Sequence, residues 1–336
     1  MAAAKVGVSM SVALSVVVPC FNEERALPRL FARLRQVLPA AAGTFEVIFV
    51  DDGSTDRTLP LLRAFFSADQ RFRYVALSRN FGKESAMLAG LGRACGDAVA
   101  IVDADLQHPP ELLTEMMRLL REGHDQVIAR RRTRAGDPRV RAFLAHLFYR
   151  LINRMVDVEI ADGLGDFRLL DRKAVDALLS MGEYNRFSKG LFAWIGFDTV
   201  TVGYDNVPRA GGTSKWTVRK LLDYGIDGVV SFNNRPLRLA IYAGALSTLV
   251  AFGYAAWVLV SALVQGNPVP GYVTTICGVF VFGGLQLLIL GVIGEYLGRI
   301  YFETKRRPHF LIREASESAP ATLPLPRVTA RPRADR

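Results

Sequence analysis

Residues 98–105 read Ala-Val-Ala-Ile-Val-Asp-Ala-Asp, an apolar run followed at once by two carboxylates. A short run of this kind, bounded by polar residues, is typical of a strand buried on both faces of a parallel sheet. Four further short runs also predict buried strands, at residues 14–18, 46–50, 72–77 and 126–129. Amphipathic stretches between them predict helices, at residues 24–38, 59–68, 84–94 and 110–122. Strand and helix in alternation predict an α/β domain whose mostly parallel sheet is flanked by helices.

Polar residues follow the predicted strands, at the edge where ligands bind in such sheets. Asp103 and Asp105 follow the 98–102 strand, and alternate residues of a strand share a face, so both carboxylates can converge on one cation. Mg²⁺ and Mn²⁺ take oxygen ligands, commonly one or two carboxylates together with substrate phosphates. The alternative for an Asp-x-Asp taken alone is a solvated acidic turn.

Two other polar segments are expected at the same edge. Residues 19–24 read Pro-Cys-Phe-Asn-Glu-Glu, and residues 51–56 read Asp-Asp-Gly-Ser-Thr-Asp. Ser54 or Asp56 can cap the following helix, which leaves Asp51 and Asp52 to hydrogen-bond a ribose or a base edge. The sequence has no Gly-x-Gly-x-x-Gly and no P-loop pattern, so neither of those phosphate-binding mechanisms is supported.

Residues 239–294 contain no Asp, Glu, Lys or Arg. Because one bilayer span needs about 20 apolar residues, we expect two transmembrane helices, at about 239–264 and 272–294. Basic residues flank this stretch on both outer sides, and the positive-inside rule then predicts that the catalytic domain and both termini are cytoplasmic. The predicted regions are an α/β domain (1–213), an interfacial juxtamembrane helix region (214–238), the two spans (239–298) and a basic, largely disordered tail (299–336).

The net charge of +10 indicates the kind of partner, and the three cysteines bear on whether disulfides or a zinc site are expected. Much of the basic excess lies after the second predicted span, next to lipid headgroups, and no nucleic-acid motif accompanies it. The lipid bilayer, and no nucleic acid, is therefore the predicted partner. The cysteines are odd in number, widely spaced and without a Cys-x-x-Cys pair, which argues against a disulfide framework or a zinc site.

Three segments, taken in order and spacing, resemble the inverting family 2 glycosyltransferases, which have the GT-A fold: residues 16–24, 50–56 and 103–110. More narrowly, the chain is similar to the polyprenyl-phosphate glycosyltransferases, which include dolichyl-phosphate mannose synthases and bacterial undecaprenyl-phosphate sugar transferases. Further segments that match this subfamily are residues 80–83, 165–170, 209–216 and 294–299. The resemblance implies a nucleotide-sugar-binding domain with an interfacial helix and two C-terminal transmembrane helices. It also implies a location in the cell inner membrane.

The implied activity is transfer of one sugar, with inversion, from a nucleotide sugar to undecaprenyl phosphate or another polyprenyl phosphate. UDP-glucose or a related UDP-hexose is the expected donor, because residues 231–239 look like the bacterial glucosyl transferases. A phosphate monoester has a second pKa of about 6 and is already an anionic nucleophile at neutral pH. The reaction then depends on a cation for the departing diphosphate and on arginines for the acceptor phosphate.

The resemblance assigns roles to individual residues. Those expected around the nucleoside are Pro19, Asn22, Glu24 and Asp52, with Lys83 near it. Those expected to hold Mg²⁺ or Mn²⁺ are Asp103, Asp105 and Gln107, and Asp103 also serves the donor diphosphate. Those expected to bind phosphates are Arg130, Arg131, Arg209 and Lys215. Asp166 is expected at the reaction centre, as a base or as a residue that orients the acceptor. Its alternative is a loop carboxylate paired with Arg168 or Arg172. Those expected to act in catalysis are Asp105, Asp166, Arg131 and Arg209.

Two other functions compete with this interpretation. A processive polysaccharide synthase shares the broad fold, but the sequence has no Gln-x-x-Arg-Trp motif and two spans are few for a polymer channel. A membrane sugar-binding subunit that has lost catalysis is the other, and the intact carboxylate motifs argue against it. Glycines at 283, 284, 291 and 294 allow close helix packing, and the resemblance adds a tetramer as the expected homo-oligomer.

Overall fold

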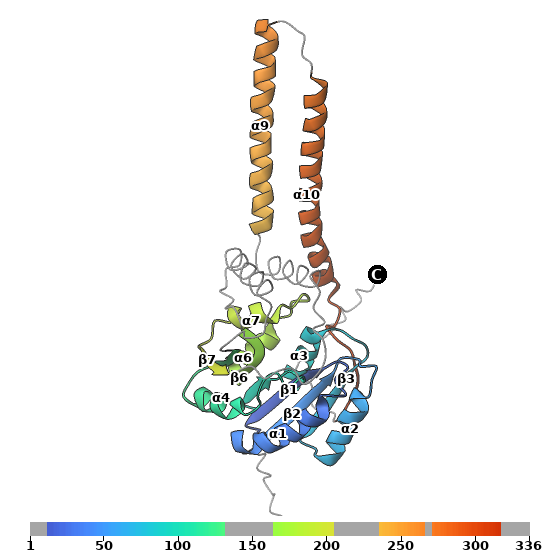
Figure 1. Ribbon diagram of the computed structural model, residues 1–336, viewed down its shortest axis with the longest axis vertical. Coiled ribbons are helices and arrows are strands. Elements are labelled where there is room, and N and C mark those ends of the chain that lie inside the picture. Colours follow the sequence, from blue (N-terminus) through green and yellow to red (C-terminus); the bar gives the residue numbers. More distant parts are fainter. Residues whose placement is uncertain (1–11, 132–163, 205–234, 266–270, 317–336) are drawn as a thin grey trace, which may run out of the picture. The chain divides into compact units, whose positions relative to one another are not determined.

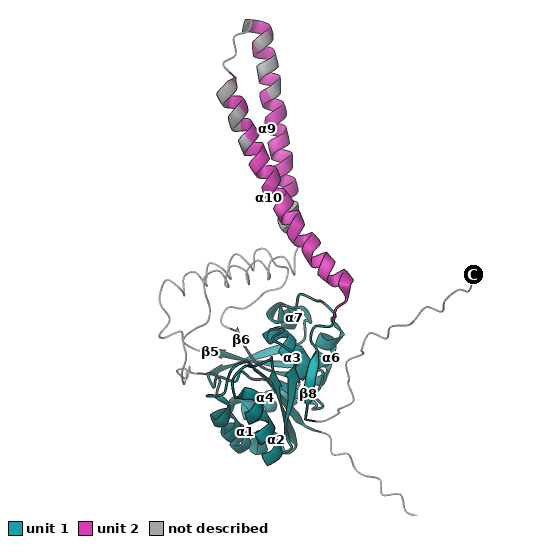
Figure 2. Cartoon of the chain, turned by 90° about the vertical axis from the view of Figure 1, so that its right-hand side faces the viewer, with its two compact units in different colours: residues 1–149, 159–216, 308–336 teal, residues 150–158, 217–307 magenta. Residues whose placement is uncertain are grey.

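The computed structural model describes residues 12–131, 164–204, 235–265 and 271–316 (Figure 1). The chain divides into two compact units, which Figure 2 colours separately. Unit 1 comprises Met1–Tyr149, Glu159–Trp216 and Pro308–Arg336, and unit 2 comprises Arg150–Val158 and Thr217–Arg307. Residues 214–234 of the predicted juxtamembrane helix region lie outside the described residues.

Unit 1 is built on a sheet whose described strands follow the order β7-β5-β6-β4-β1-β2-β3-β8. The strands are β1 (Leu14–Cys20), β2 (Phe45–Asp51), β3 (Phe72–Leu77), β4 (Ala98–Ile101), β5 (Gln126–Arg131), β6 (Leu164–Asp171), β7 (Thr199–Tyr204) and β8 (Ile312–Ala315). Pairing is parallel within β4-β1-β2-β3 and between β5 and β7. Only β6 and β8 run antiparallel to their described neighbours. The predicted mostly parallel sheet is confirmed.

The helices of unit 1 are α1 (Leu27–Ala41), α2 (Thr58–Ala68), α3 (Lys83–Leu91), α4 (Leu112–Arg121), α6 (Arg172–Ser180) and α7 (Ser188–Trp194). The first four confirm the predicted amphipathic stretches. Four leucines of α1, spaced three or four apart, are fully buried: Leu27, Leu30, Leu34 and Leu38. They join a core with the residues of β1 and β2 that point to the same face, while α3 packs against the other face. There Gly90 permits close approach, because a Cβ at this position would lie 2.2 Å from Cγ1 of Val17.

Two strands lie where the sequence did not predict them. β6 was not recognised because Asp166 and Arg168 interrupt its apolar run with charges. β8 lies within residues 299–336, which were expected to form a largely disordered tail. Its short sequence, Ile-Arg-Glu-Ala, has too few apolar residues to predict a strand. Backbone hydrogen bonding to the edge strand β3 provides the stabilisation that buried side chains provide in the other strands.

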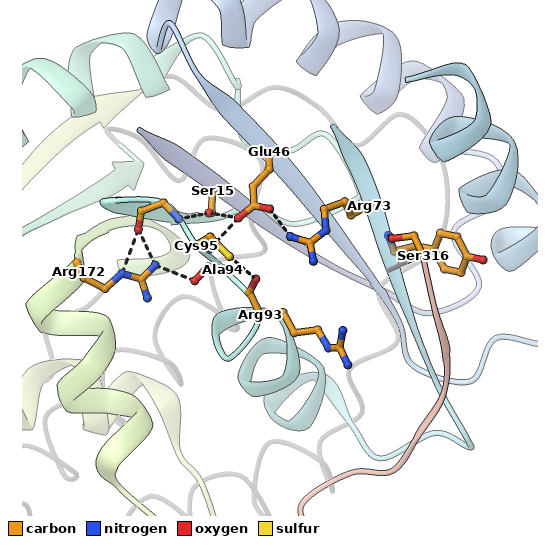
Figure 3. Close-up of polar contacts among 10 residues, drawn as sticks. Ser15, Glu46, Arg73, Arg93, Ala94, Cys95, Arg172 and Ser316 are labelled. Atoms are coloured by element: carbon orange, nitrogen blue, oxygen red, sulfur yellow. Dashed lines mark hydrogen bonds and ion pairs between the residues drawn. The ribbon is translucent and has the colours of Figure 1, made fainter. Parts of the chain in front are cut away.

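A buried polar cluster lies at the amino ends of the strands, opposite the edge where ligands are expected (Figure 3). The carboxylate of Glu46 accepts hydrogen bonds from Ser15 Oγ at 2.6 Å and from the Cys95 backbone N–H at 2.8 Å. It also accepts one from Arg73 at 2.5 Å. The Gly96 N–H donates to Ser15 Oγ, which extends the cluster to the turn before β4. Each of the two carboxylate oxygens of Glu46 thus has a partner although the residue is buried.

Unit 2 contains two long helices, α9 (Arg235–Gln265) and α10 (Tyr272–Lys305). Within the described residues, Val281–Lys305 is the one segment that is long and apolar enough to cross a membrane. The apolar stretch Ala240–Tyr254 of α9 is shorter than that criterion requires. Two helices therefore lie where two spans were expected, and length and composition support one of them as a span.

Candidate active site

The carboxyl ends of β1, β2, β3 and β4 meet at one edge of the sheet because these strands are parallel. β6 is antiparallel to β4, so its first residues lie at that same edge. Ile101 pairs with Arg168, and the same register continued by two residues places Asp103 opposite Asp166. Two carboxylates far apart in the sequence are therefore neighbours, and their predicted roles in the reaction stay predictions.

Lys83 joins these two carboxylates. It begins α3 directly after the loop that follows β3. Its ammonium nitrogen lies 2.5 Å from Oδ1 of Asp103 and 2.5 Å from Oδ2 of Asp166. The sequence placed Lys83 near a nucleoside, and its role as a bridge between the two carboxylates was not predicted. The carboxylates are more sheltered than the lysine, at 25% and 20% exposure against 42%.

This bridge fixes the charge state of its members. Burial alone would lower the pKa of Lys83, but the adjacent carboxylates of Asp103 and Asp166 raise it overall. Burial would likewise raise the pKa of Asp166, yet Lys83, Lys189 and Arg168 hold it well below its ordinary value. Lys83 is therefore cationic and Asp166 anionic across the whole neutral pH range.

The loops after β1 and β2 are held together by hydrogen bonds between them. Asn22, with φ of +55°, donates its N–H to Oγ of Ser54 at 2.9 Å and accepts the Thr55 N–H at 2.9 Å. Glu24 accepts the Arg57 N–H and donates its own N–H to Asp56. The side chains of Asn22 and Glu24 thus shape the two loops. Pro19 lies near the end of β1, beside these loops. Their contact with a nucleoside stays a prediction.

Asp52 holds the loop that leads to Lys83. Its two carboxylate oxygens accept the N–H groups of Phe81 at 2.7 Å and Gly82 at 2.9 Å. Burial raises the pKa of Asp52 even though these backbone hydrogen bonds lower it. The neighbouring Asp51 is fully buried and accepts the Ser54 N–H. Asp52 therefore positions residues 81–83, and its direct contact with substrate stays a prediction.

Gly53 offers a test of how tightly these loops pack. Its φ is +69°, and a Cβ there would lie 2.4 Å from the carbonyl carbon of Arg79. We expect Gly53→Ala to destabilise the protein by about 1–3 kcal/mol, through backbone strain and displacement of the 79–82 loop. Gly43→Ala is the matched control, because nothing lies within 4 Å of its Cβ position. Thermal unfolding of both variants in detergent checks this, and equal melting temperatures would contradict it.

Asp105 and Gln107 form a tight turn directly after Asp103. Asp105 accepts the Gln107 N–H at 3.1 Å across Leu106, whose φ is +60°. Within the described part of the chain, no three His, Cys, Asp or Glu side chains gather to enclose a metal. The donor set of Asp103, Asp105 and Gln107 nevertheless fits Mg²⁺ or Mn²⁺, which take one or two carboxylates and complete their shell with phosphate and water. The Lys83 ammonium already shows that a cation is held against Asp103.

The predicted phosphate-binding residues are only partly described. Arg130 is exposed near the end of β5, and Arg131 is the last residue of that strand. Arg209 and Lys215 lie outside the described residues. Arg130 and Arg131 therefore lie at the carboxyl end of a strand parallel to β4, and their phosphate contacts stay a prediction.

Two residues near the site, Glu84 and His108, were not assigned a role from the sequence. Glu84 is sheltered, burial raises its pKa, and it accepts hydrogen bonds from the N–H and the hydroxyl of Ser188, the first residue of α7. His108 is buried against Phe167 and lies 3.9 Å from Oδ2 of Asp103. The signal for Glu84 was its place as the only acid of α3, where every later residue is small or apolar.

The chain is similar to known proteins over most of its length. The family model "Glycosyl transferase family 2" matches residues 15–179, and "GtrB C-terminal hairpin" matches residues 235–300. Glycosyltransferase CsbB of Bacillus subtilis is 49% identical over 303 residues, covering 90% of this chain and 92% of the relative. A bactoprenol glucosyl transferase of Shigella phage SfII is 38% identical, covering 91% of this chain and 99% of the relative.

Among solved structures, mannosyltransferase PcManGT from Pyrobaculum calidifontis, in complex with GDP-Man and Mn²⁺, aligns with a TM-score of 0.45 and 18% identity. That alignment covers 86% of this chain and 88% of the solved one, and it is too distant to inform the site. The sequence relatives decide the matter: this chain is a glycosyltransferase and belongs to family 2, with a C-terminal hairpin of the GtrB type.

Proposed function

We propose that this glycosyltransferase moves one sugar from a nucleotide sugar, with UDP-glucose the first candidate, to undecaprenyl or another polyprenyl phosphate. The observation that carries the proposal is the bridge from Asp103 through Lys83 to Asp166 at the ligand-binding edge of the sheet. Relatives that align over nearly their whole length include one named bactoprenol glucosyl transferase, which supports a polyprenyl phosphate as acceptor.

In the proposed reaction, an oxygen of the acceptor phosphate attacks the anomeric carbon of the sugar. The bond from that carbon to the diphosphate breaks, and the nucleoside diphosphate leaves with the electron pair. The phosphate is already anionic at neutral pH, so no proton has to be removed before attack. Asp166 is held ionised by Lys83 and is therefore suited to orient the acceptor or the sugar, with no need for it to act as a strong base.

The remaining task is to hold two phosphate-bearing substrates beside each other. Asp103, Asp105 and Gln107 would hold Mg²⁺ or Mn²⁺, which supplies positive charge to the departing diphosphate. Arginines suit the acceptor phosphate because a guanidinium binds two phosphate oxygens at once. Arg130 and Arg131 are the described candidates, and Arg209 and Lys215 are further candidates from the sequence.

We place this reaction at the cytoplasmic face of the inner membrane. A polyprenyl tail stays in the bilayer, so the enzyme must be held at its surface. Val281–Lys305 within α10 meets the length and hydropathy of a span, and we propose α9 as the second span. Both termini would then be cytoplasmic by the positive-inside rule. A homo-oligomer built through the glycines of α10 stays a prediction.

The test uses detergent-purified full-length protein, undecaprenyl phosphate, Mg²⁺ or Mn²⁺, and a panel of labelled nucleotide sugars. We expect metal-dependent transfer of label from one donor into organic-extractable lipid. Asp105→Asn is expected to lower this transfer at least 100-fold, because one predicted metal ligand is lost. The matched control is Asp176→Asn, which removes an exposed carboxylate of α6. No transfer from any donor by a folded protein would contradict the proposal.

A further inference from the structure

The chain enters the sheet of unit 1 a second time after the apolar hairpin. α10 ends at Lys305, and β8 (Ile312–Ala315) pairs antiparallel with β3. Figure 2 accordingly colours β8 with unit 1 and α10 with unit 2. We call residues 308–316 the return segment. The proposed function assigns no role to the return segment.

The return segment is fixed to unit 1 along its whole described length. At one end, Ser316 donates its N–H to the Tyr74 carbonyl at 3.0 Å and accepts the Tyr74 N–H on its hydroxyl. In the middle, Arg63 of α2 donates two hydrogen bonds to the two carboxylate oxygens of Glu314, at 2.8 and 2.7 Å. A two-pronged pair of this kind fixes the direction as well as the distance between its partners.

The other end of the segment reaches the loop that carries Lys83. Ser78 follows the last residue of β3 and donates its N–H to the Leu311 carbonyl at 2.8 Å. The loop from Ser78 to Lys83 is short, and Asp52 holds its middle through the N–H groups of Phe81 and Gly82. Its start is therefore held by the return segment, its middle by Asp52, and its end by Asp103 and Asp166.

A second contact of the return segment reaches the connection that leads to α7. The ring of His309 stacks on that of Tyr184, with centroids 5.8 Å apart and planes inclined by 25°. Tyr184 lies in the connection that leads to α7, whose first residue, Ser188, donates hydrogen bonds to Glu84. Glu84 is the neighbour of Lys83 in α3. The return segment thus contacts both segments that lead to the Lys83–Glu84 pair.

We propose that the return segment is a positioning element for the reaction: by holding Ser78 and Tyr184 it sets the place of Lys83 between Asp103 and Asp166. The expected effect on turnover rests on the proposed function. The expected effect on the 78–83 loop rests only on the contacts of the return segment. A displacement of about 1 Å in such a site can cost 10- to 100-fold in rate. Loss of the segment should therefore lower kcat and leave the core of the sheet intact.

The first test compares two shortened chains with the full one. One ends at Arg307 and lacks the return segment, and its control ends at Ser316 and keeps it. We expect hydrogen exchange in the peptide covering residues 78–84 to accelerate at least tenfold in the first chain only, with β1 and β2 unchanged. We expect kcat to fall about 10- to 100-fold while the KM for donor changes much less.

A second test leaves the chain length unchanged, in case the shortened chain does not fold. Arg63→Glu and Glu314→Arg each break the two-pronged pair, and the double variant restores it with the charges exchanged. We expect faster exchange at residues 78–84 in each single variant and recovery in the double variant. Arg118→Glu, which breaks an exposed arginine–glutamate pair on α4, is the matched control.

Unchanged exchange at residues 78–84 in the chain ending at Arg307 would overturn the positioning role. Equal acceleration across β1, β2 and the loop would also overturn it, because the segment would then only stabilise the fold. These exchange measurements need no substrate. Failure of the full-length chain to transfer any sugar would instead count against the proposed function, so the two failures can be told apart.

Discussion

Replacing Lys83 with methionine is expected to lower kcat for sugar transfer by about 100- to 1,000-fold. Methionine keeps much of the side-chain volume and removes the ammonium that lies 2.5 Å from both Asp103 and Asp166. Two sheltered carboxylates would then face each other without the ammonium between them, and their repulsion would displace the site. Steady-state kinetics of the purified variant measures the loss.

The same variant should lose activity at a higher pH than the wild type does as the pH is lowered. In the wild type the pKa of Asp166 lies well below its ordinary value, so this carboxylate stays ionised and limits neither rate nor stability near neutral pH. Its ionisation stabilises the fold at every pH above the pKa that Asp166 has in the unfolded chain. This stabilisation is lost only as the pH falls through the lower pKa that Asp166 has in the folded protein. Without Lys83 the strongest of the charges that lower the pKa of Asp166 is lost, and this pKa rises above its wild-type value. As the pH is lowered, the rate of Lys83→Met should therefore begin to fall at a higher pH than the rate of the wild type.

Lys173→Met is the control for this prediction. Lys173 also lies 2.5 Å from a carboxylate, that of Asp125, but on the exposed surface away from the candidate site. We expect wild-type kcat and an unchanged pH profile for it. An active Lys83→Met enzyme, with the profile of the wild type, would show that the bridge has no part in the reaction.

Replacing Glu46 with alanine is expected to destabilise the protein by about 3–5 kcal/mol. The change leaves the Arg73 guanidinium, whose side chain is only 11% exposed, without its carboxylate. It also removes the acceptor for the Ser15 hydroxyl and the Cys95 N–H. Because breaking a buried ion pair costs far more than losing an exposed one, this position should be among the most sensitive in unit 1.

The thermal midpoint of the detergent-purified protein checks this second prediction. Glu115→Ala is the matched control, since it removes the exposed carboxylate partner of Arg118 on α4, and its midpoint should not change measurably. A Glu46→Ala protein as stable as the control would contradict a structural role for the cluster in Figure 3.

The sequence could predict the elements whose signal is local. The five apolar runs correspond to β1 to β5, and the predicted helices between them correspond to α1 to α4. A strand that is buried on both faces has a continuous run of apolar residues, which can be recognised in the sequence. β6 was missed for the opposite reason. It carries Asp166 and Arg168, and the guanidinium of Arg168 lies 3.6 Å from the centre of the Phe192 ring, a contact that no local pattern reveals.

The residues of the candidate site likewise include some that a local sequence pattern indicates and others that only the fold brings together. Asp103 and Asp105 were found because they directly follow a strand. The bridge through Lys83 could not be predicted, because it depends on the antiparallel register of β4 and β6 and on residues far apart in the chain. β8 is the extreme case: its pairing with β3 joins residues separated by the whole apolar hairpin, and its four residues have no distinctive pattern.

The mass of the lipid product tests the central claim most directly. Full-length protein is incubated with undecaprenyl phosphate, divalent cation and the preferred nucleotide sugar, and the extracted lipid is examined by mass spectrometry. We predict a single new species that is heavier than the acceptor by one sugar residue, and none with Asp105→Asn. A ladder of several sugars per lipid, or label found only in a water-soluble polymer, would contradict transfer of one sugar to a polyprenyl phosphate.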